Sequence, residues 1–428
     1  MLDIKFIKEN REIVEKAIEN KKVKGEINLD GLFELHNKRS DLRIRLDEVN
    51  TKRNQAAKEQ NIEEGRMLKE EGSKLEEEFA VVDKDFIKIM LKVPNIPSAD
   101  TPIGPDESAN QVVRQWGEKP NFSFTPKEHF VIGEYLDVIN KEKAAEVSGS
   151  RFAYIKGDLA LMQFALIQLA METVTNEDIL KVIAEEADLE VDTKPFIPVV
   201  PPVMVKPAVY NRMARLDPKE DKYHITEDDL YLAGSAEHTL GPIHMDEVIS
   251  NDKMPVRYIG YSTNFRREAG TYGKDTNGIL RMHQFDKLEM ETFCLPENSK
   301  TEQDFLVAIQ EYLMRKLKLP YRVVAVCTGD MGTPDHRQID IETWMPGQDK
   351  YRETHSADLM TSFQSRRLNT KVKIEGGKPE YVHMNDATLF AIGRILIAII
   401  ENYQEEDGSI RIPEVLQKHM GGRERISK

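Results

Sequence analysis

Residues 262–291, STNFRREAGTYGKDTNGILRMHQFDKLEME, decide the fold of this chain. Apolar and aromatic residues lead to Phe265, a segment rich in glycine and charge follows, and an apolar run returns from Ile279 to Phe285. This order is typical of two strands joined by a long hairpin loop. We therefore predict that the segment forms an antiparallel pair of strands.

Two arginines flank this loop, together with acidic and aromatic residues at even spacing. Arg281, Phe285 and Glu289 are four apart, so along a continuous strand their side chains project from one face. Arg266 and Glu268 share a face of the first strand by the same rule. Arginine matches the geometry of phosphate and carboxylate, and an aromatic ring can stack on a base. The segment therefore has the groups to hold a nucleotide and an amino acid, although an ordinary exposed hairpin is the local alternative.

Length and composition are those of a soluble chain of two or three domains. The chain has 428 residues, of which 40% are hydrophobic and 31% charged, with a mean hydropathy of −0.52. Its longest purely apolar run, 395–400, is too short to cross a bilayer, so we expect no membrane association. The net charge of −14 argues against nonspecific coating of nucleic acid, and we expect no DNA partner. It allows an RNA partner bound by a local basic surface.

The N-terminus and the cysteines indicate a cytoplasmic protein. The first ten residues, MLDIKFIKEN, lack a hydrophobic signal core and include acidic residues, so no presequence is evident. Cys294 and Cys327 cannot form a disulfide framework and lack the spacing of a zinc site.

Residues from about 28 to 93 have the pattern of two coiled-coil arms. The segment has no proline, is rich in charge and carries apolar residues seven apart. The repeating positions are Leu35, Leu42, Val49 and Ala56 on the first arm and Leu68, Leu75, Val82 and Ile89 on the second. Polar residues around 60–65 allow the chain to reverse, which predicts an antiparallel hairpin roughly 45 Å long.

Two uses of this hairpin are open. It could be a dimerisation coiled coil, or a lever that grips an elongated partner. Basic residues concentrate on the first arm, which suits contacts to phosphates, although such a charge run also occurs on solvated faces. They are Lys38, Arg39, Arg43, Arg45, Lys52, Arg53 and Lys58.

Beyond the hairpin, residues 94–126 are rich in proline, serine and aspartate and predict a linker that wraps onto the next domain. Residues 150–172 run from a strand-like start into an amphipathic helix. The apolar segment 195–205 contains paired prolines, which place it at the edge or the beginning of a strand.

The segments FRREAG at 265–270 and GILRMHQFDKLE at 278–289 resemble motif 2 of the class II aminoacyl-tRNA synthetases, in the form found in seryl-tRNA synthetases. The resemblance continues in order along the whole chain. It implies an α+β fold in which a long N-terminal antiparallel coiled-coil hairpin precedes a catalytic domain, built on an antiparallel β-sheet flanked by helices. The implied domains are a tRNA-binding domain at 1–110 and a catalytic domain at 111–428. The helix and the strand ending at Pro202 resemble motif 1, which implies a homodimer, and a buried edge strand is the alternative.

The resemblance assigns Arg266, Arg281 and Arg394 as the catalytic, ATP-binding arginines. Arg266 would bridge the amino-acid carboxylate and the α-phosphate, and Arg281 would hold the γ-phosphate. Arg394 opens an apolar helix and is expected to be buried against another phosphate, because a buried arginine without an anion is costly. Phe285 would stack under adenine, and Glu268 would contact the adenine edge.

The segment YRETHS at 351–356 matches the family pattern YxExxS. The resemblance implies that Glu353 and Ser356 bind ATP through Mg²⁺, because hard cations prefer carboxylate, hydroxyl and phosphate oxygens. We interpret His355 as noncatalytic, since attack of a carboxylate on a phosphate needs no general base.

The residues implied to bind L-serine are Ser235, Glu237, Arg266, Glu289, Asp386 and Thr388. The chain departs from the family twice here. The family usually has threonine where this chain has Ser235, and, aligned on Arg394, it usually has asparagine where this chain has Asp386. Without the resemblance, the GSAE segment around Ser235 is typical of a helix cap. The carboxylate of Asp386 could help to hold a cation near the substrate ammonium group.

The resemblance implies a serine–tRNA ligase, which joins L-serine and ATP to seryl-adenylate, releases pyrophosphate and transfers serine to tRNA(Ser). Whether tRNA(Sec) is a second acceptor is open. One alternative is a ligase that charges a carrier protein or another small amino acid, which the departures at Ser235 and Asp386 keep open. Another is a noncatalytic tRNA-binding paralogue, which would be favoured if Arg266 and Glu353 did not converge on one pocket.

Overall fold

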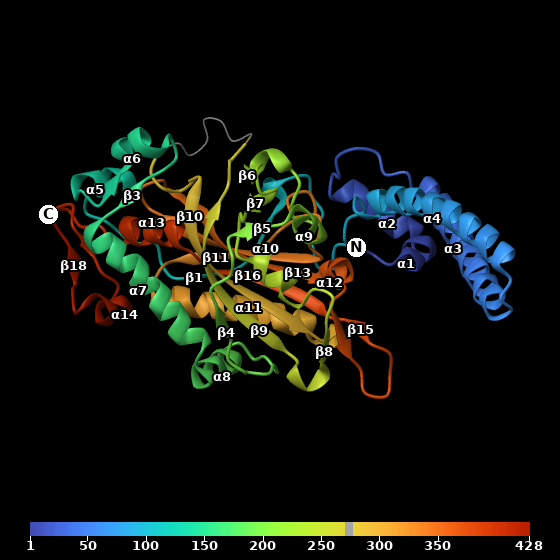
Figure 1. Cartoon of the computed structure of the whole chain (residues 1–428). Helices are drawn as coiled ribbons and strands as arrows, with labels where there is room; N and C mark the ends of the chain where they lie inside the picture. The colour runs from blue at the N-terminus through green and yellow to red at the C-terminus, as the bar shows by residue number, and fades with distance from the viewer. Residues whose placement is uncertain (270–276) are drawn as a thin grey trace. The chain divides into compact units, whose positions relative to one another are not determined.

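The computed structural model describes residues 1–269 and 277–428. They divide into two compact units, Met1–Ile96 and Pro97–Lys428 (Figure 1). The expected hairpin loop, with Gly270 and Gly273, lies largely outside the described residues. The division falls before the boundary expected at residue 110, because residues 97–110 pack within the second unit.

The first unit consists of α1 (Ile4–Glu9), α2 (Arg11–Asn20), α3 (Leu29–Lys58) and α4 (Ile62–Met90). Helices α3 and α4 form the expected hairpin, and Leu42, Val49, Leu68, Leu75 and Val82 are buried between them. The Oδ1 atoms of two asparagines cap these helices: Asn28 accepts from the N–H of Gly31 at 2.9 Å, and Asn61 from that of Glu64 at 3.2 Å.

The hairpin turn is shorter than the sequence predicted. The chain reverses at residues 59–61, where Gln60 takes a left-handed conformation with a φ of 55°. Gly65, which we expected to help the chain reverse, lies in the first turn of α4.

Backbone hydrogen bonds fix the start of the second unit to the loop at residues 326–336, between two strands of the main sheet. The N–H of Ser98 donates to the carbonyl of His336 at 2.7 Å, and that of Gly329 donates to the carbonyl of Gly104 at 3.0 Å. A Cβ at Gly329 would lie 2.4 Å from the carbonyl oxygen of Pro105, so the close approach requires glycine there. The segment leads into β1 (Gln111–Trp116), an edge strand of the sheet.

Among the described residues, eight strands form the main sheet of the second unit (Figure 1). Their order is β1, β11 (Tyr321–Ala325), β12 (Arg337–Met345), β13 (Lys350–Thr361), β16 (His383–Ala391), β10 (Gln284–Cys294), β9 (Val256–Phe265) and β4 (Ile197–Val199). Neighbours are antiparallel except for β4 and β9, which are parallel. The proline-rich segment 195–205 thus contributes an edge strand, as predicted.

Smaller elements surround this sheet. The helices are α5 (His129–Tyr135), α6 (Lys141–Ser148), α7 (Gly157–Val174), α8 (Glu177–Glu186), α9 (Pro207–Arg212), α10 (Glu237–Leu240), α11 (Ser299–Lys316), α12 (Phe363–Leu368), α13 (Ile392–Asn402) and α14 (Glu414–Gln417). The short strands are β2 (Ile139–Asn140), β3 (Tyr154–Ile155), β5 (Met204–Val205), β6 (His224–Ile225), β7 (Leu230–Leu232), β8 (Val248–Ser250), β14 (Lys371–Lys373), β15 (Glu380–Tyr381), β17 (Ile410–Arg411) and β18 (Arg425–Ile426). No helix within the described residues is long and apolar enough to span a membrane.

Alternation along the central strands separates the core from the site. Leu288 and Met290 of β10 and Leu389 of β16 belong to the main hydrophobic core, together with residues of α11 and α13. Their neighbours Lys287 and Thr388 line a cavity on the opposite face. The sheet therefore has one face covered by α11 and α13 and one polar face that carries the candidate site.

The strands of segment 262–291 are shorter than predicted. Strand β9 ends at Phe265 and β10 begins only at Gln284, so Arg266, Glu268 and Arg281 lie outside both strands. Glu268 has a left-handed φ of 53°. The prediction that even spacing puts side chains on one strand face is therefore wrong for these three residues. It applies to Phe285 and Glu289, which both lie in β10.

Candidate active site

A cavity of about 220 Å³ on the polar face of the sheet gathers most of the residues expected to bind substrates. Those that line it are Glu237, Arg266, Glu268, Arg281, Phe285, Glu353, Ser356, Thr388 and Arg394. Ser235, Glu289 and Asp386 are buried and contact residues of the lining. Arg266 and Glu353 thus share one cavity, so the condition that would favour a noncatalytic paralogue is not met.

Glu289 of β10 lies buried behind the cavity lining, where it contacts Thr388 of β16, which lines the cavity, and Ser235 of the loop after β7. We call these three residues the floor. The carboxylate of Glu289 accepts hydrogen bonds from Thr388 Oγ1 at 3.4 Å and Ser235 Oγ at 3.2 Å. Lys287 forms an ion pair with Glu289 and donates to Ser235 Oγ at 3.0 Å. Burial raises the pKa of Glu289 to about 7, although the charge of Lys287 opposes the rise. The floor therefore offers hydroxyl and carboxylate oxygens to a small polar group.

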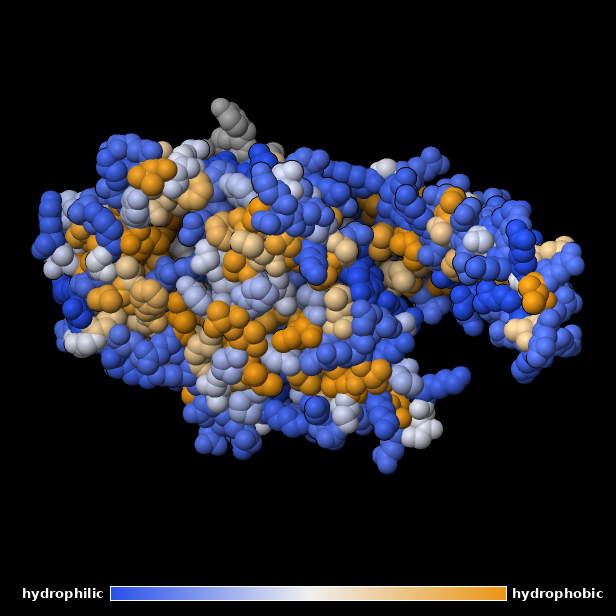
Figure 2. All heavy atoms as spheres, viewed as in Figure 1, coloured by the Kyte–Doolittle hydropathy of each residue, from blue (hydrophilic) through white to orange (hydrophobic). Residues whose placement is uncertain are grey.

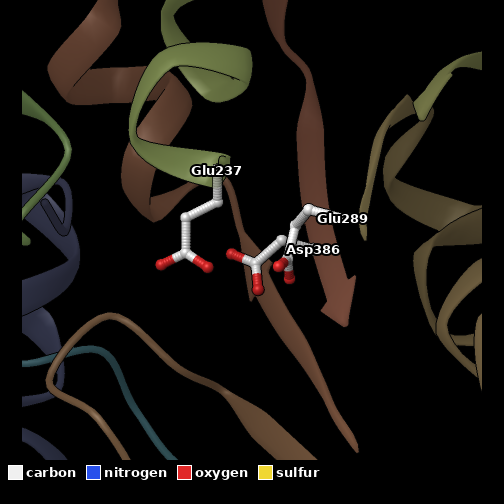
Figure 3. A group of neighbouring side chains, drawn as sticks. All are labelled: Glu237, Glu289 and Asp386. Atoms are coloured by element: carbon white, nitrogen blue, oxygen red, sulfur yellow. The ribbon is translucent and has the colours of Figure 1, made fainter. Parts of the chain in front are cut away.

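Three carboxylates converge beside this floor (Figure 3). Glu237 reaches in from the start of α10, Glu289 from β10 and Asp386 from β16, and one oxygen of each lies within 4.8 Å of the others. All three are buried. Such a group suits a cation, either an ammonium group or a metal ion. Ser235 is not the cap that GSAE suggested, because α10 begins after Ala236 and has no side-chain cap hydrogen bond.

Arg266 lies between this acidic group and the aromatic side of the cavity. Its Nε donates to the carbonyl of Gly234 at 2.9 Å, and its guanidinium carbon lies 5.3 Å from the centre of the Phe285 ring. Arg281 Nη1 lies 2.6 Å from Glu268 Oε2. Two guanidinium groups and an aromatic face therefore surround the same space, as a bound nucleotide would require.

Glu353 and Ser356 both line the cavity although they are three residues apart on β13. In a regular strand they would face opposite sides. The register against β12 shifts between Ile341 and Glu342, which leaves Thr354 as the extra residue of a bulge. The bulge returns both side chains to the polar face.

The chemistry of these donors fits a hard divalent cation. Glu353 offers a carboxylate and Ser356 a hydroxyl, whose Oγ donates to Asp358 Oδ1 at 3.1 Å. Burial and the charge of Glu353 raise the pKa of the neighbouring Asp340 well above its usual range. A second negative charge next to Glu353 is therefore unfavourable, and a divalent cation bound there would lessen the repulsion.

Arg394 is less buried than predicted. It lies in the first turn of α13, and 27% of its side chain is exposed. Nη1 contacts Glu353 Oε1 at 3.0 Å and the backbone carbonyl of Glu353 at 2.9 Å. The argument from an unpaired buried charge was therefore wrong, because Arg394 lies at the cavity rim with a carboxylate partner.

The two buried histidines of the site are neutral. Burial lowers the pKa of His355 to about 3 and that of His238 to about 4. His238 Nδ1 accepts from the N–H of Gly234 at 3.1 Å, which orients the ring in the loop before α10. Neither ring is charged near pH 7, and the noncatalytic role of His355 stays a prediction.

Two residues of the site were missed in the sequence. Lys287 could have been predicted from the sequence, because it lies between Phe285 and Glu289 at even spacing on β10. Arg215 could not, because it is a single arginine in the loop after α9 and belongs to no sequence pattern. Both line the cavity.

Known proteins match the chain along its whole length. Residues 1–97 match the Seryl-tRNA synthetase N-terminal domain, and residues 222–403 match the tRNA synthetase class II core domain (G, H, P, S and T). A serine–tRNA ligase of Dehalococcoides mccartyi is 40% identical over 426 residues, which cover 98% of this chain and 99% of the relative. The chain belongs to the seryl-tRNA synthetase family. A ligase of Symbiobacterium thermophilum is 36% identical, with 98% of each chain covered.

Solved structures of the family agree with the fold. The seryl-tRNA synthetase of Pyrococcus horikoshii, complexed with ATP, is 33% identical with a TM-score of 0.86 and covers 100% of this chain and 99% of its own. The cytoplasmic serine–tRNA ligase of Naegleria fowleri, in complex with AMP, is 28% identical with a TM-score of 0.83 and the same coverage. The predicted α+β fold and the enzyme class, an ATP-dependent aminoacyl-tRNA ligase, are confirmed.

Proposed function

We propose that this member of the seryl-tRNA synthetase family activates L-serine in the cavity on its polar sheet face and then transfers it to tRNA(Ser). The observation that carries the proposal is the convergence of Arg266, Arg281 and Arg394 on a cavity that Thr388 lines, with Glu289 buried directly behind Thr388. Cations are thus available for the ATP phosphates, and oxygen atoms for a small hydroxyl-bearing amino acid. The cytoplasm, where these substrates occur together, is the expected compartment, and tRNA(Sec) is a second candidate acceptor.

Adenylation requires two anions to be held together. The serine carboxylate attacks the α-phosphorus of ATP, the bond to the bridging oxygen breaks, and pyrophosphate leaves. Arg266 would neutralise both the attacking carboxylate and the α-phosphate, while Arg281 and Arg394 would hold the outgoing phosphates. Phe285 would stack under adenine and Glu268 would contact its edge, after releasing Arg281 to the phosphate. The rate enhancement would come from positioning and charge neutralisation.

The amino-acid subsite would bind both the ammonium group and the hydroxyl group of serine. Glu237 and Asp386, with Ser235 nearby, would hold the ammonium group, and Glu289 and Thr388 would pair with the hydroxyl. A site built around a hydroxyl rejects an analogue that lacks it by roughly 10⁴-fold. Glu353 and Ser356 would hold Mg²⁺, which when bound would neutralise negative charge on the ATP phosphates.

The basic residues of α3 support tRNA as the second partner. Lys38 pairs with Glu78 at 2.9 Å and Arg43 with Asp47 at 3.7 Å. Within the described chain, no ion pair holds the exposed side chains of Lys52, Arg53 and Lys58. These three are therefore available to phosphate groups.

The test of this partner is a triple variant, Lys52→Gln, Arg53→Gln and Lys58→Gln. We expect weaker tRNA(Ser) binding and charging, and the slope of log affinity against log salt concentration should fall by about 1 for each side chain that binds a phosphate. Serine-dependent adenylation without tRNA should stay unchanged. The matched control removes three exposed lysines from α4, Lys69, Lys74 and Lys84. Equal tRNA binding by both triple variants would contradict the proposed role of α3.

An apolar surface on the second unit supports a homodimer. Ile197 on β4, Val200 just after it, and Leu161 and Phe164 on α7 are 42–87% exposed. Figure 2 shows apolar residues gathered over the face where β4 lies. A self-complementary apolar surface is the usual basis of a twofold dimer.

Val200→Asp should therefore shift the protein to the monomer, because it would place charges on the apolar surface proposed as the dimer interface. Light scattering at micromolar concentration measures the mass. Val81→Asp, at an exposed valine of α4, is the control and should leave the mass unchanged. A monomeric unsubstituted protein, or a dimeric Val200→Asp variant, would refute this interface.

A further inference from the structure

Arg215 is surrounded by carboxylates from four separate segments. It follows α9 after Ala214, whose left-handed φ of 60° turns the chain inward, and only 17% of its side chain is exposed. Nε lies 3.0 Å from Glu237 Oε1, and Nη2 lies 3.5 Å from oxygens of Asp335, Asp358 and Asp386. One guanidinium group thus contacts carboxylates of the loop at 335, β13, β16 and α10.

The surroundings are built to hold this guanidinium group. Asp358 and Asp386 are directly opposite each other on β13 and β16. At Gly332, a Cβ would lie 2.4 Å from Asp335 Oδ2 and 3.1 Å from Arg215 Nη1, so the loop packs closely over the ion pair. Two of these partners, Glu237 and Asp386, belong to the acidic group of Figure 3.

The charge of Arg215 opposes the effect of burial on the pKa of Glu237 more strongly than any other group does. Burial alone would raise the pKa of Glu237, but the charge of Arg215, together with His238 and Lys287, holds it well below its usual range. For Asp386, burial and the charge of Glu237 raise the pKa well above its usual range, despite Arg215. The titratable or polar groups that face Glu237 are Ser235, His238, Lys287, Glu289, Glu291, Asp386, Lys222 and Tyr210.

We propose that Arg215 is a positioning residue of the amino-acid subsite, which keeps Glu237 ionised and aimed, beside Asp386, at the place of the substrate ammonium group. The proposal rests on the proposed function, since it takes this acidic group as the ammonium site. Arg215 would act through the two carboxylates without touching ATP. Arg215 would therefore determine the affinity of the site for the amino acid and the dependence of that affinity on pH.

The test is pyrophosphate exchange with the full chain, with serine and ATP varied separately from pH 5.5 to 8.5. Arg215→Met should raise the KM for serine at pH 7 by roughly tenfold or more, because Glu237 then binds a proton at neutral pH. The KM for ATP should stay within about twofold. The acid limb of kcat/KM for serine should move up into this pH range, whereas in the unsubstituted protein it lies below it. Arg215→Lys keeps the charge and should leave that limb near its original position.

Two further variants separate this role from a structural one. Arg212→Met removes an arginine three residues earlier, which contacts Asp246 at 3.0 Å outside the cavity, and should change neither the serine KM nor the acid limb. Asp335→Asn removes a competitor for Arg215 and should leave Glu237 ionised, so the KM for serine should not rise between pH 8.5 and pH 5.5. It also provides a test if Arg215→Met does not fold, because an acid limb that moved up into this pH range would then overturn the proposal.

The outcomes distinguish the two proposals. If Arg215→Met leaves the serine KM and acid limb unchanged while Glu237→Gln raises the KM, the role of Arg215 is overturned and the proposed function stands. If the unsubstituted protein shows no exchange with serine, both proposals are overturned.

Discussion

Replacing Arg266 by glutamine is expected to lower serine-dependent pyrophosphate exchange by roughly 10³-fold, the largest loss that we expect from a single residue. Arg266 is the cation placed between the acidic group and Phe285, so its loss leaves the carboxylate and the α-phosphate to repel each other. The effect should fall mainly on kcat, because that repulsion is greatest as the two groups approach in the transition state.

The adjacent Arg267 is the matched control. Its side chain is exposed, its guanidinium carbon lies 5.9 Å from the centre of the Tyr223 ring, and it is not part of the cavity lining. Arg267→Gln should therefore keep exchange within a few-fold of the unsubstituted protein. Similar losses in both variants would mean that the segment after β9 matters only for folding.

Replacing Glu289 by alanine should abolish the preference for serine over alanine. We expect the unsubstituted protein to prefer serine by roughly 10⁴-fold in kcat/KM, and the variant to prefer it by about tenfold or less. Glu289 is the floor group that contacts both Thr388 and Ser235, so its removal takes away the main partner of a substrate hydroxyl. Pyrophosphate exchange measured with serine and then with alanine gives the ratio of the two kcat/KM values.

Glu291→Ala is the control for this experiment, because it removes a buried carboxyl group two residues later on the same face of β10. Burial and the charges of Glu237 and Glu289 raise the pKa of Glu291 well above its usual range, which favours its uncharged form. The control should lose stability but keep the preference for serine. A Glu289→Ala variant that still rejects alanine would show that the hydroxyl is recognised elsewhere.

The hairpin could be predicted from the sequence because its signal is local. Residues seven apart, such as Leu42 and Val49, are buried in the predicted helices, and Asn28 and Asn61 cap them. The edge position of β4 could also be predicted locally, from the prolines of segment 195–205. The family resemblance supplied the residues of the cavity, since no local pattern relates Glu237 to Arg394.

Features that depend on pairing between distant strands could not be predicted. A bulge at Thr354 brings Glu353 and Ser356 to one face, and the register shift that places Thr388 opposite Glu289 is of the same kind. Arg215 was missed because its four partners come from segments scattered over more than a hundred residues. The burial of Arg394 was wrongly predicted because the carboxylate that pairs with it, Glu353, lies on β13, far from α13 in the sequence.

The measurement that tests the central claim most directly is amino-acid-dependent exchange of labelled pyrophosphate into ATP, without tRNA, for serine, threonine, alanine and glycine in parallel. We predict exchange with serine and little or none with the other three, even though Asp386 stands where the family usually has asparagine. Exchange that favours another amino acid, or none with any of the four, would contradict this claim.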